Sequence, residues 1–382
     1  MIIGIQYYAL LAASAVIYWL IPRQKARNYF LSAVSLLFIF YFDRSAGIMT
    51  AALSVYTYSF AYLIEKYRDR TTFHKISVIG LVVVLAVFKY LGFFSNMTAQ
   101  LHGFISAFPY IRIEFILLPL GISYIVFKHI SYLTDIHWRI NDRGSFIDFL
   151  LYSSLFTIFV AGPIERFSRF KIESERENKF SYSLVEDSFT RIVYGVFKKF
   201  VIADWLGYFT APVWTNPGEY SPVIKALALL GYSIQIYMDF SAYSDIAIGA
   251  SKLYGFKIME NFDYPYFKSN ISQFWRSWHI SLSDWIRDYL FFPLSRAFEN
   301  RVWQIFFVPL IAMGICGLWH GPAAHFLLWG VLHGFALFVF QIWAMMKKKN
   351  PALSRISKTK WFNAAGVVFT FLYVTACWLA FR

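Results

Sequence analysis

The chain begins with a long stretch that carries no charge, and similar stretches recur along most of its length. Met1 to Pro22 contains no Asp, Glu, Lys or Arg. An apolar segment of about 20 residues can cross the roughly 30 Å hydrocarbon core of a bilayer as a helix. Because lipid offers no hydrogen-bond partners, the backbone of each such segment must satisfy itself as a helix. The pattern therefore predicts an all-α integral membrane protein.

The composition supports this class. Of the 382 residues, 58% are hydrophobic and 15% are charged, whereas a soluble domain has about 25% charged residues. The net charge of +14 would suggest nucleic-acid binding in a soluble protein. Here the basic residues lie in short loops between apolar runs, as in cytoplasmic loops of membrane proteins. We therefore expect the lipid bilayer as a partner and no nucleic acid. The two cysteines, Cys316 and Cys377, exclude a disulfide framework and a multi-cysteine metal site.

Apolar segments of spanning length divide the chain, and one further segment is interrupted. Residues 115–134 are apolar but include Pro119, Gly121, Lys128 and His129, which predicts a broken or re-entrant helix buried in protein. The start of the chain lacks a basic region and a cleavage site, so we expect a retained first span rather than a signal peptide. The predicted spans are 2–21, 28–42, 46–64, 76–94, 147–164, 192–209, 223–250, 303–319, 323–343 and 362–381.

The distribution of Lys and Arg predicts the orientation. Basic clusters follow the first span (23–27) and the third span (66–75), whereas loop 95–112 contains one basic residue, Arg112. Since cytoplasmic loops collect Lys and Arg, we expect the N-terminus outside and the first two clusters inside. The basic segment 344–360 is placed inside on the same ground.

Two segments are too polar to span. Segment 165–191 is rich in both charge signs and is expected to be a helix on the cytoplasmic surface. Segment 257–300 mixes charged residues with aromatic ones, including Trp275, Trp278 and Trp285. Single tryptophans are common interfacial anchors, but a cluster of this size favours a segment that lies at the cytoplasmic face or enters a cavity.

Two histidines are candidates for catalysis. His320 lies in Gly317-Leu318-Trp319-His320-Gly321-Pro322 between two apolar runs, and His279 lies among the aromatic residues of 275–283. An ionisable residue at membrane depth is costly and usually functional, and a helix opened by Gly and Pro is tolerated there where it lines a cavity. For three further histidines a structural role and a functional one stay equally open: His129, His325 and His333.

Other polar residues of the apolar runs have simpler interpretations. Asp239 and Asp245 lie six apart in one predicted helix, where hydrogen bonding between helices is the favoured role. His320 and His325 lie five apart, unlike the paired ligands of HExxH, so we expect no metal. Cys316 lies four residues before His320 and would share its helical face, which leaves a covalent Cys–His route open. A small buried hydrophobe is the favoured role of Cys316.

Several short segments between residues 118 and 340 match one family in order. They are Leu118–Tyr124, Ala161–Ile164, Phe197–Asp204, Gln235–Asp245, Glu260–Phe262, Phe274–Ser283, Trp285–Leu290 and Gly317–Gly321. Together they resemble the membrane-bound O-acyltransferase family. The resemblance is strongest to the branch with the bacterial alginate O-acetyltransferase membrane subunit, and weaker to the teichoic-acid D-alanyl transferase. Cys316 stands where relatives of this family usually have glycine, and His129 where the alginate-type relatives usually have another polar residue.

The resemblance implies a fold of about 10 or 11 transmembrane helices, with re-entrant segments, around a central tunnel between the two membrane faces. On this basis we divide the chain into N-terminal helices (1–112), a catalytic core (113–343) and a basic loop with a last helix (344–382). The resemblance also implies a multi-pass protein of the bacterial inner membrane. It implies His320 as the catalytic histidine and His279 as the second family histidine near it.

The chemistry implied is transfer of an acetyl group from cytoplasmic acetyl-CoA to a hydroxyl. A histidine titrates near neutrality and suits the general base, so we assign that role to His320. Arg276, Trp278 and Arg287 are the candidates for binding coenzyme A, although the two arginines could equally be interfacial anchors. The expected acceptor is an extracytoplasmic polysaccharide or cell-wall polymer, in some relatives reached through a secreted SGNH-type transferase.

Two alternative functions remain. The first is transfer of a D-alanyl or other acyl group from a carrier protein. The second is a transporter or channel, which paired inverted repeats would support; the sequence shows none. Consumption of a thioester by the purified protein separates an enzyme from a channel.

Overall fold

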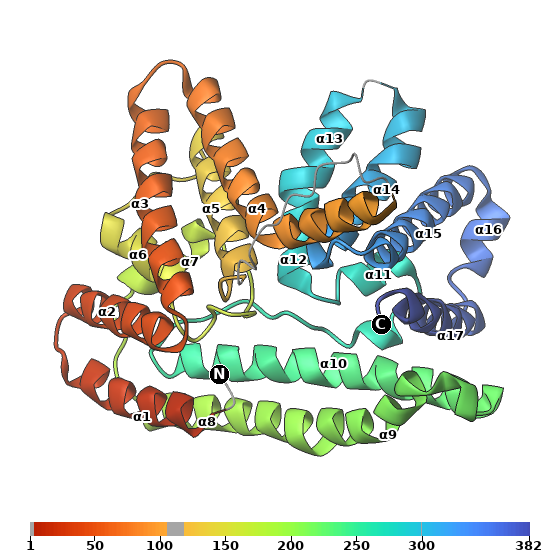
Figure 1. The fold of residues 1–382 in the computed structure, drawn as a ribbon, viewed down its shortest axis with the longest axis horizontal. Helices are drawn as coiled ribbons and strands as arrows, with labels where there is room; N and C mark the ends of the chain where they lie inside the picture. Colours follow the sequence, from red (N-terminus) through yellow and green to blue (C-terminus); the bar gives the residue numbers. More distant parts are fainter. Residues whose placement is uncertain (1–3, 105–117, 299) are drawn as a thin grey trace. The chain divides into compact units, whose positions relative to one another are not determined.

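The computed structural model describes residues 4–104, 118–298 and 300–382, and every regular element in them is a helix (Figure 1). The predicted all-α class is confirmed. The chain forms two compact units, Met1–Val193 with Asp245–Met259 and Tyr194–Ser244 with Glu260–Arg382. The boundary predicted at residue 112 lies outside the described residues, so that division stays a prediction.

The helices of the first unit are α1 (Ile5–Leu20), α2 (Gln24–Phe42), α3 (Arg44–Lys66), α4 (Arg70–Phe104), α5 (Ile122–His137), α6 (Phe146–Ser154) and α7 (Phe167–Glu175). Two helices run through both units, α8 (Tyr182–Phe197) and α10 (Pro222–Lys252). The second unit contains a π-turn (Lys198–Ala203), α9 (Asp204–Thr215), α11 (Ile271–Trp275), α12 (Ile280–Ile286), α13 (Phe292–Ala297), α14 (Arg301–His320), α15 (Ala324–Lys349), α16 (Pro351–Ile356) and α17 (Lys360–Cys377).

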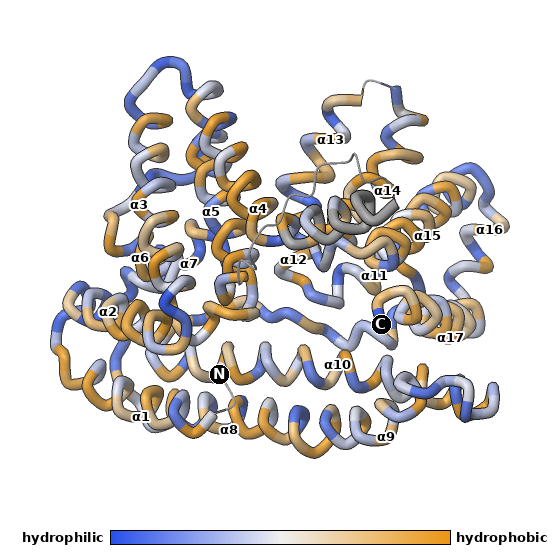
Figure 2. Tube along the Cα trace, in the orientation of Figure 1, coloured by the Kyte–Doolittle hydropathy of each residue, from blue (hydrophilic) through white to orange (hydrophobic). Residues whose placement is uncertain are grey.

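Six described helices are long and apolar enough to cross a membrane, and α1 is a shorter apolar helix. Figure 2 shows hydrophobic residues along these helices and hydrophilic turns after α3 and α15. In α10, only 11% of its apolar 18-residue stretch is buried inside the protein. The exposed apolar surface of this helix is therefore suited to the hydrocarbon core of a bilayer. The chain is a multi-pass membrane protein. The six segments are Arg44–Lys66, Arg70–Leu91, Pro222–Lys252, Val302–His320, Ala324–Lys349 and Lys360–Ala380.

The predicted span 147–164 is wrong. Helix α6 ends at Ser154, and residues 155–165 form turns and irregular backbone. Phe156 and Phe159 are fully buried in the first unit, and the backbone N–H of Phe156 donates to Ser35 Oγ at 3.2 Å. Protein rather than lipid covers this apolar run, which is why a non-helical backbone is tolerated. The expected surface helix at 165–191 is likewise divided between α7 and the start of α8.

The interrupted segment near residue 120 becomes α5, and residues 115–117 of the prediction lie outside the described part. Gly121 precedes α5 with a φ of 73°, and a Cβ there would lie 2.9 Å from the carbonyl oxygen of Phe159. His129 on α5 is buried, with Thr57 Oγ1 2.9 Å from its Nδ1 and Ser153 Oγ 2.7 Å from its Nε2. Both ring nitrogens are satisfied, so the structure favours the structural role of His129.

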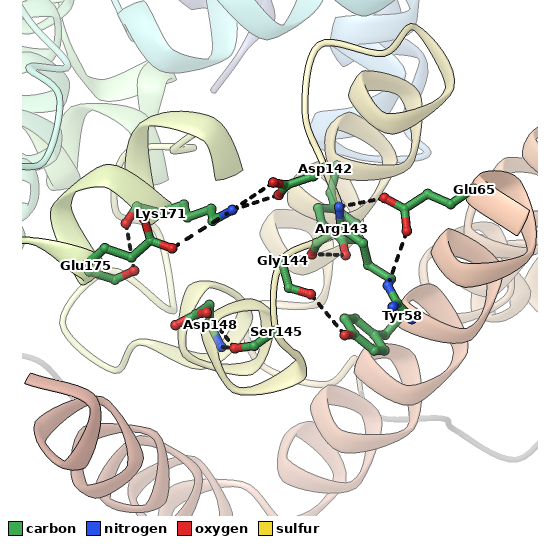
Figure 3. Close-up of polar contacts among 11 residues, drawn as sticks. Tyr58, Glu65, Asp142, Arg143, Gly144, Ser145, Asp148, Lys171 and Glu175 are labelled. Atoms are coloured by element: carbon green, nitrogen blue, oxygen red, sulfur yellow. Dashed lines mark hydrogen bonds and ion pairs between the residues drawn. The ribbon is translucent and has the colours of Figure 1, made fainter.

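One end of the first unit carries a cluster of polar contacts (Figure 3). Arg143 binds Glu65 on α3 through its backbone N–H at 2.8 Å and its Nε at 3.3 Å. Lys171 on α7 lies 2.7 Å from Asp142 Oδ1. This hydrogen bond to Asp142 raises the pKa of Lys171 above its usual range. Ion pairs with this degree of exposure are typical of a protein surface in contact with water, so we expect this end of the first unit to be hydrated.

In the second unit, α14 and α15 pack through glycines. A Cβ on Gly330 would collide with the carbonyl oxygen of Met313, and one on Gly334 would lie 2.8 Å from Leu310 Cα. A Cβ on Gly317 would collide with the carbonyl oxygen of Phe326. Small residues let membrane helices approach closely where lipid supplies no hydrophobic driving force.

We predict that Gly330→Ala lowers the thermal stability of the detergent-purified protein, because the added methyl group must separate α14 from α15. Overpacking of this kind costs about 1–3 kcal/mol. Gly218→Ala is the matched control, since nothing lies within 4 Å of a Cβ at that position. Thermal unfolding followed by tryptophan fluorescence measures both variants. Equal midpoints for the two would contradict the packing argument.

Candidate active site

The polar and aromatic segment that follows α10 folds into short helices in the second unit (Figure 1). Asn261 holds this segment together and is fully buried. Its backbone carbonyl accepts from the N–H of Ile280 at 2.9 Å, and its side-chain Oδ1 accepts from Ser281 Oγ at 2.9 Å and from Ser281 N–H at 3.2 Å. Its Nδ2 donates to Ser244 Oγ on α10 at 3.2 Å. Asn261 thereby fixes the start of α12 against α10.

His279 occupies the N-cap of α12 in a left-handed conformation, with φ 44° and ψ 55°. This conformation costs a non-glycine residue about 1–3 kcal/mol and is typical of functional sites. The side chain is only 3% exposed, and its two ring nitrogens have no hydrogen-bond partner among the described residues. Its ring packs edge-on against Phe240 of α10 at 4.6 Å. A buried imidazole with both nitrogens available is a rare exception to hydrogen-bond satisfaction.

His320 is the last residue of α14. The helix ends there because Gly321 is fully extended, and α15 starts only at Ala324. The His320 ring is half-buried and packs edge-on against Trp329 at 5.1 Å and Phe381 at 4.8 Å. The opening of the helix at Gly321, expected from the sequence, therefore places the imidazole at a helix end among aromatic rings.

His279 and His320, although distant in sequence, line one small chamber. Its volume is about 50 Å³, and its walls are otherwise apolar or aromatic. A cavity of this volume has room for only a few non-hydrogen atoms, since a single water molecule needs roughly 10–15 Å³ measured in the same way, and its apolar walls offer water few partners. The other lining residues are Ile236, Phe240, Trp275, Trp278, Leu282, Trp329, Trp378 and Phe381.

The three predicted coenzyme A contacts lie in different surroundings. Trp278 is buried and lines the chamber, whereas Arg276 and Arg287 are exposed. Arg287 is paired with Asp284 at 2.5 Å and with Asp288 at 2.9 Å, which offset its charge. Arg276 has no carboxylate partner in the part of the chain that the structure describes. Their binding role stays a prediction.

Behind the chamber wall lies His333 of α15, which is fully buried. The indole N–H of Trp275 donates to His333 Nδ1 at 3.3 Å. Sequence reasoning left the role of His333 open and did not pair it with Trp275, because no spacing rule links residues of two separate helices. His325, the third open case, is exposed and lies with its Nδ1 3.0 Å from the carbonyl oxygen of Ala380.

The two aspartates of α10 are both ion-paired. Asp239 lies 2.6 Å from Lys199 of the π-turn, which also binds Asp204 at 2.8 Å. In the first unit, Asp245 lies 2.6 Å from Arg191 of α8. The predicted helix–helix role of these carboxylates is confirmed, in the form of ion pairs.

The sequence of the chain matches the model of the membrane-bound O-acyltransferase family over residues 116–381. The chain belongs to this family. The predicted acyltransferase class is thereby confirmed at the level of the family.

Three curated relatives show the range of the family. A probable alginate O-acetylase of Azotobacter vinelandii is 33% identical over 96% of this chain and 71% of its own length. A peptidoglycan O-acetyltransferase of Helicobacter pylori is 29% identical over 80% of this chain and 61% of its own. A teichoic acid D-alanyltransferase of Streptococcus thermophilus is 29% identical over 74% of each chain. The chain thus spans only part of these longer relatives.

We predict that Asn261→Ala lowers acyl transfer roughly 10²-fold while the protein still inserts, because the loss of three side-chain hydrogen bonds lets His279 shift within the chamber. Asn270→Ala is the matched control, since the side chain of Asn270 caps the neighbouring helix α11 by accepting from the backbone N–H of Gln273. Turnover of both purified variants is compared at saturating donor. Similar turnover in the two would contradict a positioning role for Asn261.

Proposed function

We propose that the chain transfers an acetyl group from cytoplasmic acetyl-CoA towards an extracytoplasmic polysaccharide or cell-wall polymer. One observation carries the proposal: two histidines from separate helices line one chamber with apolar walls. The small volume of the chamber fits a short acyl group better than a long chain. The similarity to an alginate O-acetylase and a peptidoglycan O-acetyltransferase supports a polymer acceptor.

In the proposed mechanism, His320 removes the proton from the acceptor hydroxyl. The oxygen attacks the thioester carbonyl, the tetrahedral intermediate collapses, and coenzyme A leaves as a thiol that takes up the proton. General base catalysis contributes typically about 10²–10⁴-fold. The protonated ring nitrogen of His279 can donate to the thioester carbonyl, or its other nitrogen can accept from the acceptor hydroxyl, because neither is engaged elsewhere in the described residues. The apolar wall keeps water away from the thioester.

Donor binding is proposed at the segment that carries Arg276, Trp278 and Arg287. Trp278 reaches the chamber, so a thioester beside it would lie next to His279. Arg276 is exposed and can bind a phosphate directly. Arg287 would have to release Asp284 and Asp288 before it could bind one. A secreted SGNH-type transferase is the proposed partner for the last step to the polymer, and no metal is part of the mechanism.

Transfer of a D-alanyl group from a carrier protein is the second candidate, favoured by the similarity to teichoic acid D-alanyltransferases. The two candidates differ in the donor, so a carrier-bound thioester and acetyl-CoA offered to the same preparation separate them. Membership of an acyltransferase family favours both over the transporter or channel alternative.

We predict that His320→Ala lowers acetyl-CoA consumption by the purified protein by about 10²–10⁴-fold, because it removes the proposed base. His279→Ala is expected to be similarly severe, with some residual hydrolysis of the donor. His325→Ala is the matched control, since this histidine is exposed and lies outside the chamber lining. Release of the free thiol is the measurement. Full activity of His320→Ala in correctly inserted protein would contradict the assignment.

The same preparations distinguish direct transfer from a covalent route. Cys316 is buried and does not belong to the described chamber lining, so Cys316→Ser is expected to retain activity. Intact mass measurement after incubation with acetyl-CoA should show no added acetyl group. An adduct that disappears in Cys316→Ser would overturn the direct mechanism.

The proposed orientation has the N-terminus outside and 344–360 inside. Helix α10 then separates the inside segment 257–300 from loop 216–221, which we place outside. A thiol introduced at Gly218, where the space around a Cβ is open, should react with an impermeant maleimide in sealed cells. A thiol at the exposed Lys349 should react only after permeabilisation. The reverse pattern would refute the orientation.

A further inference from the structure

A groove of about 950 Å³ lies in the second unit between the ends of α15 and α17, beside α16 and the start of α11. Most of its wall is apolar. Trp343 of α15 and Phe362 of α17 both line the groove and stack with their ring centroids 5.8 Å apart. Deeper in, Tyr373 of α17 donates to the carbonyl oxygen of Leu332 on α15 at 2.7 Å and ties the two helices together. The wall residues used below are Phe335, Val339, Phe340 and Phe369.

The mouth of the groove is cationic. Lys347 is half-buried there, and Lys348 and Lys358 are exposed. Among the described residues that line the groove, none is acidic. None of the three lysines is ion-paired within the described part of the chain. Ser354, Ser357 and Asn363 also line the groove.

The groove extends from this cationic mouth towards the middle of the membrane. Helices α15 and α17 are both membrane spans, and the lysines stand at or just beyond the ends where they leave it. Wall residues nearer the middle of the spans are exposed: Phe335 by 51%, Val339 by 46% and Phe369 by 72%. In a bilayer these surfaces face hydrocarbon rather than water. The charges therefore lie at the interface and the apolar wall at acyl-chain depth.

We propose that this groove is a binding site for one anionic phospholipid. Its phosphate lies between Lys347, Lys348 and Lys358, and one acyl chain follows the aromatic wall. Basic pockets between membrane helices at the interface are suited to such headgroups. The phosphates of a coenzyme A thioester share this chemistry, but its acetyl group is far too small to cover the apolar wall. The apolar wall therefore favours a phospholipid over a coenzyme A thioester as the occupant.

The test is native mass spectrometry of the detergent-purified full chain, with phosphatidylglycerol and phosphatidylcholine of identical acyl chains as probes. We expect one phosphatidylglycerol to be retained in preference to phosphatidylcholine. A triple variant, Lys347→Gln, Lys348→Gln and Lys358→Gln, should weaken retention roughly 10²-fold, at roughly 5-fold for each lysine. The matched control changes the net charge equally at three neighbouring positions that do not line the groove: Lys349→Gln, Arg355→Gln and Lys360→Gln.

A second variant tests the wall without changing charge. Val339→Trp fills the groove and should lower retention of phosphatidylglycerol while leaving the lysines in place. Equal losses in the two triple variants would overturn the site in favour of general surface attraction. Equal retention of the two lipids, or displacement of phosphatidylglycerol by acetyl-CoA at equal concentration, would overturn the proposed occupant.

Discussion

The close approach of α14 and α15 is the interaction on which the chamber depends. In lipid the two helices gain little by hiding apolar side chains from their surroundings, so backbone contact through Gly317, Gly330 and Gly334 has to hold them together. The same contact sets the distance between the end of α14, where His320 lies, and Trp329 on α15. A bulkier residue at these glycines would move the histidine as well as the helix.

The two breaks in helical structure beside the chamber are satisfied in different ways. At Gly321 the chain extends for a few residues and resumes as α15. At His279 the left-handed backbone is held by Asn261, whose carbonyl and side chain bond the first residues of α12. Irregular backbone at membrane depth requires such internal partners. The strain at His279 is therefore offset by a fully buried hydrogen-bond network in the same unit.

The sequence predicts the parts of the fold that rest on length and periodicity. Long apolar runs predict most of the helices that are apolar enough to span, and the motifs around His279 and His320 point to the two histidines that line one chamber. It fails at 147–164, because hydropathy does not distinguish a run covered by lipid from one covered by protein, and Phe156 and Phe159 are covered by protein. The sequence also does not predict which residues of distant helices form hydrogen bonds with one another. The bond from Trp275 to His333 and the role of Asn261 follow from tertiary packing, which no local spacing encodes.

The bond between Trp275 and His333 has a consequence for the chamber itself. An indole N–H can only donate, so His333 Nδ1 accepts and the neutral ring carries its proton on Nε2. Turning Trp275 out of the wall would leave a buried donor and a buried acceptor unpaired, at a cost of about 1–3 kcal/mol. The indole is thus locked in one rotamer before any substrate arrives. An acyl group bound in the chamber, as proposed, would meet a preorganised wall and lose none of its binding free energy to ordering that ring.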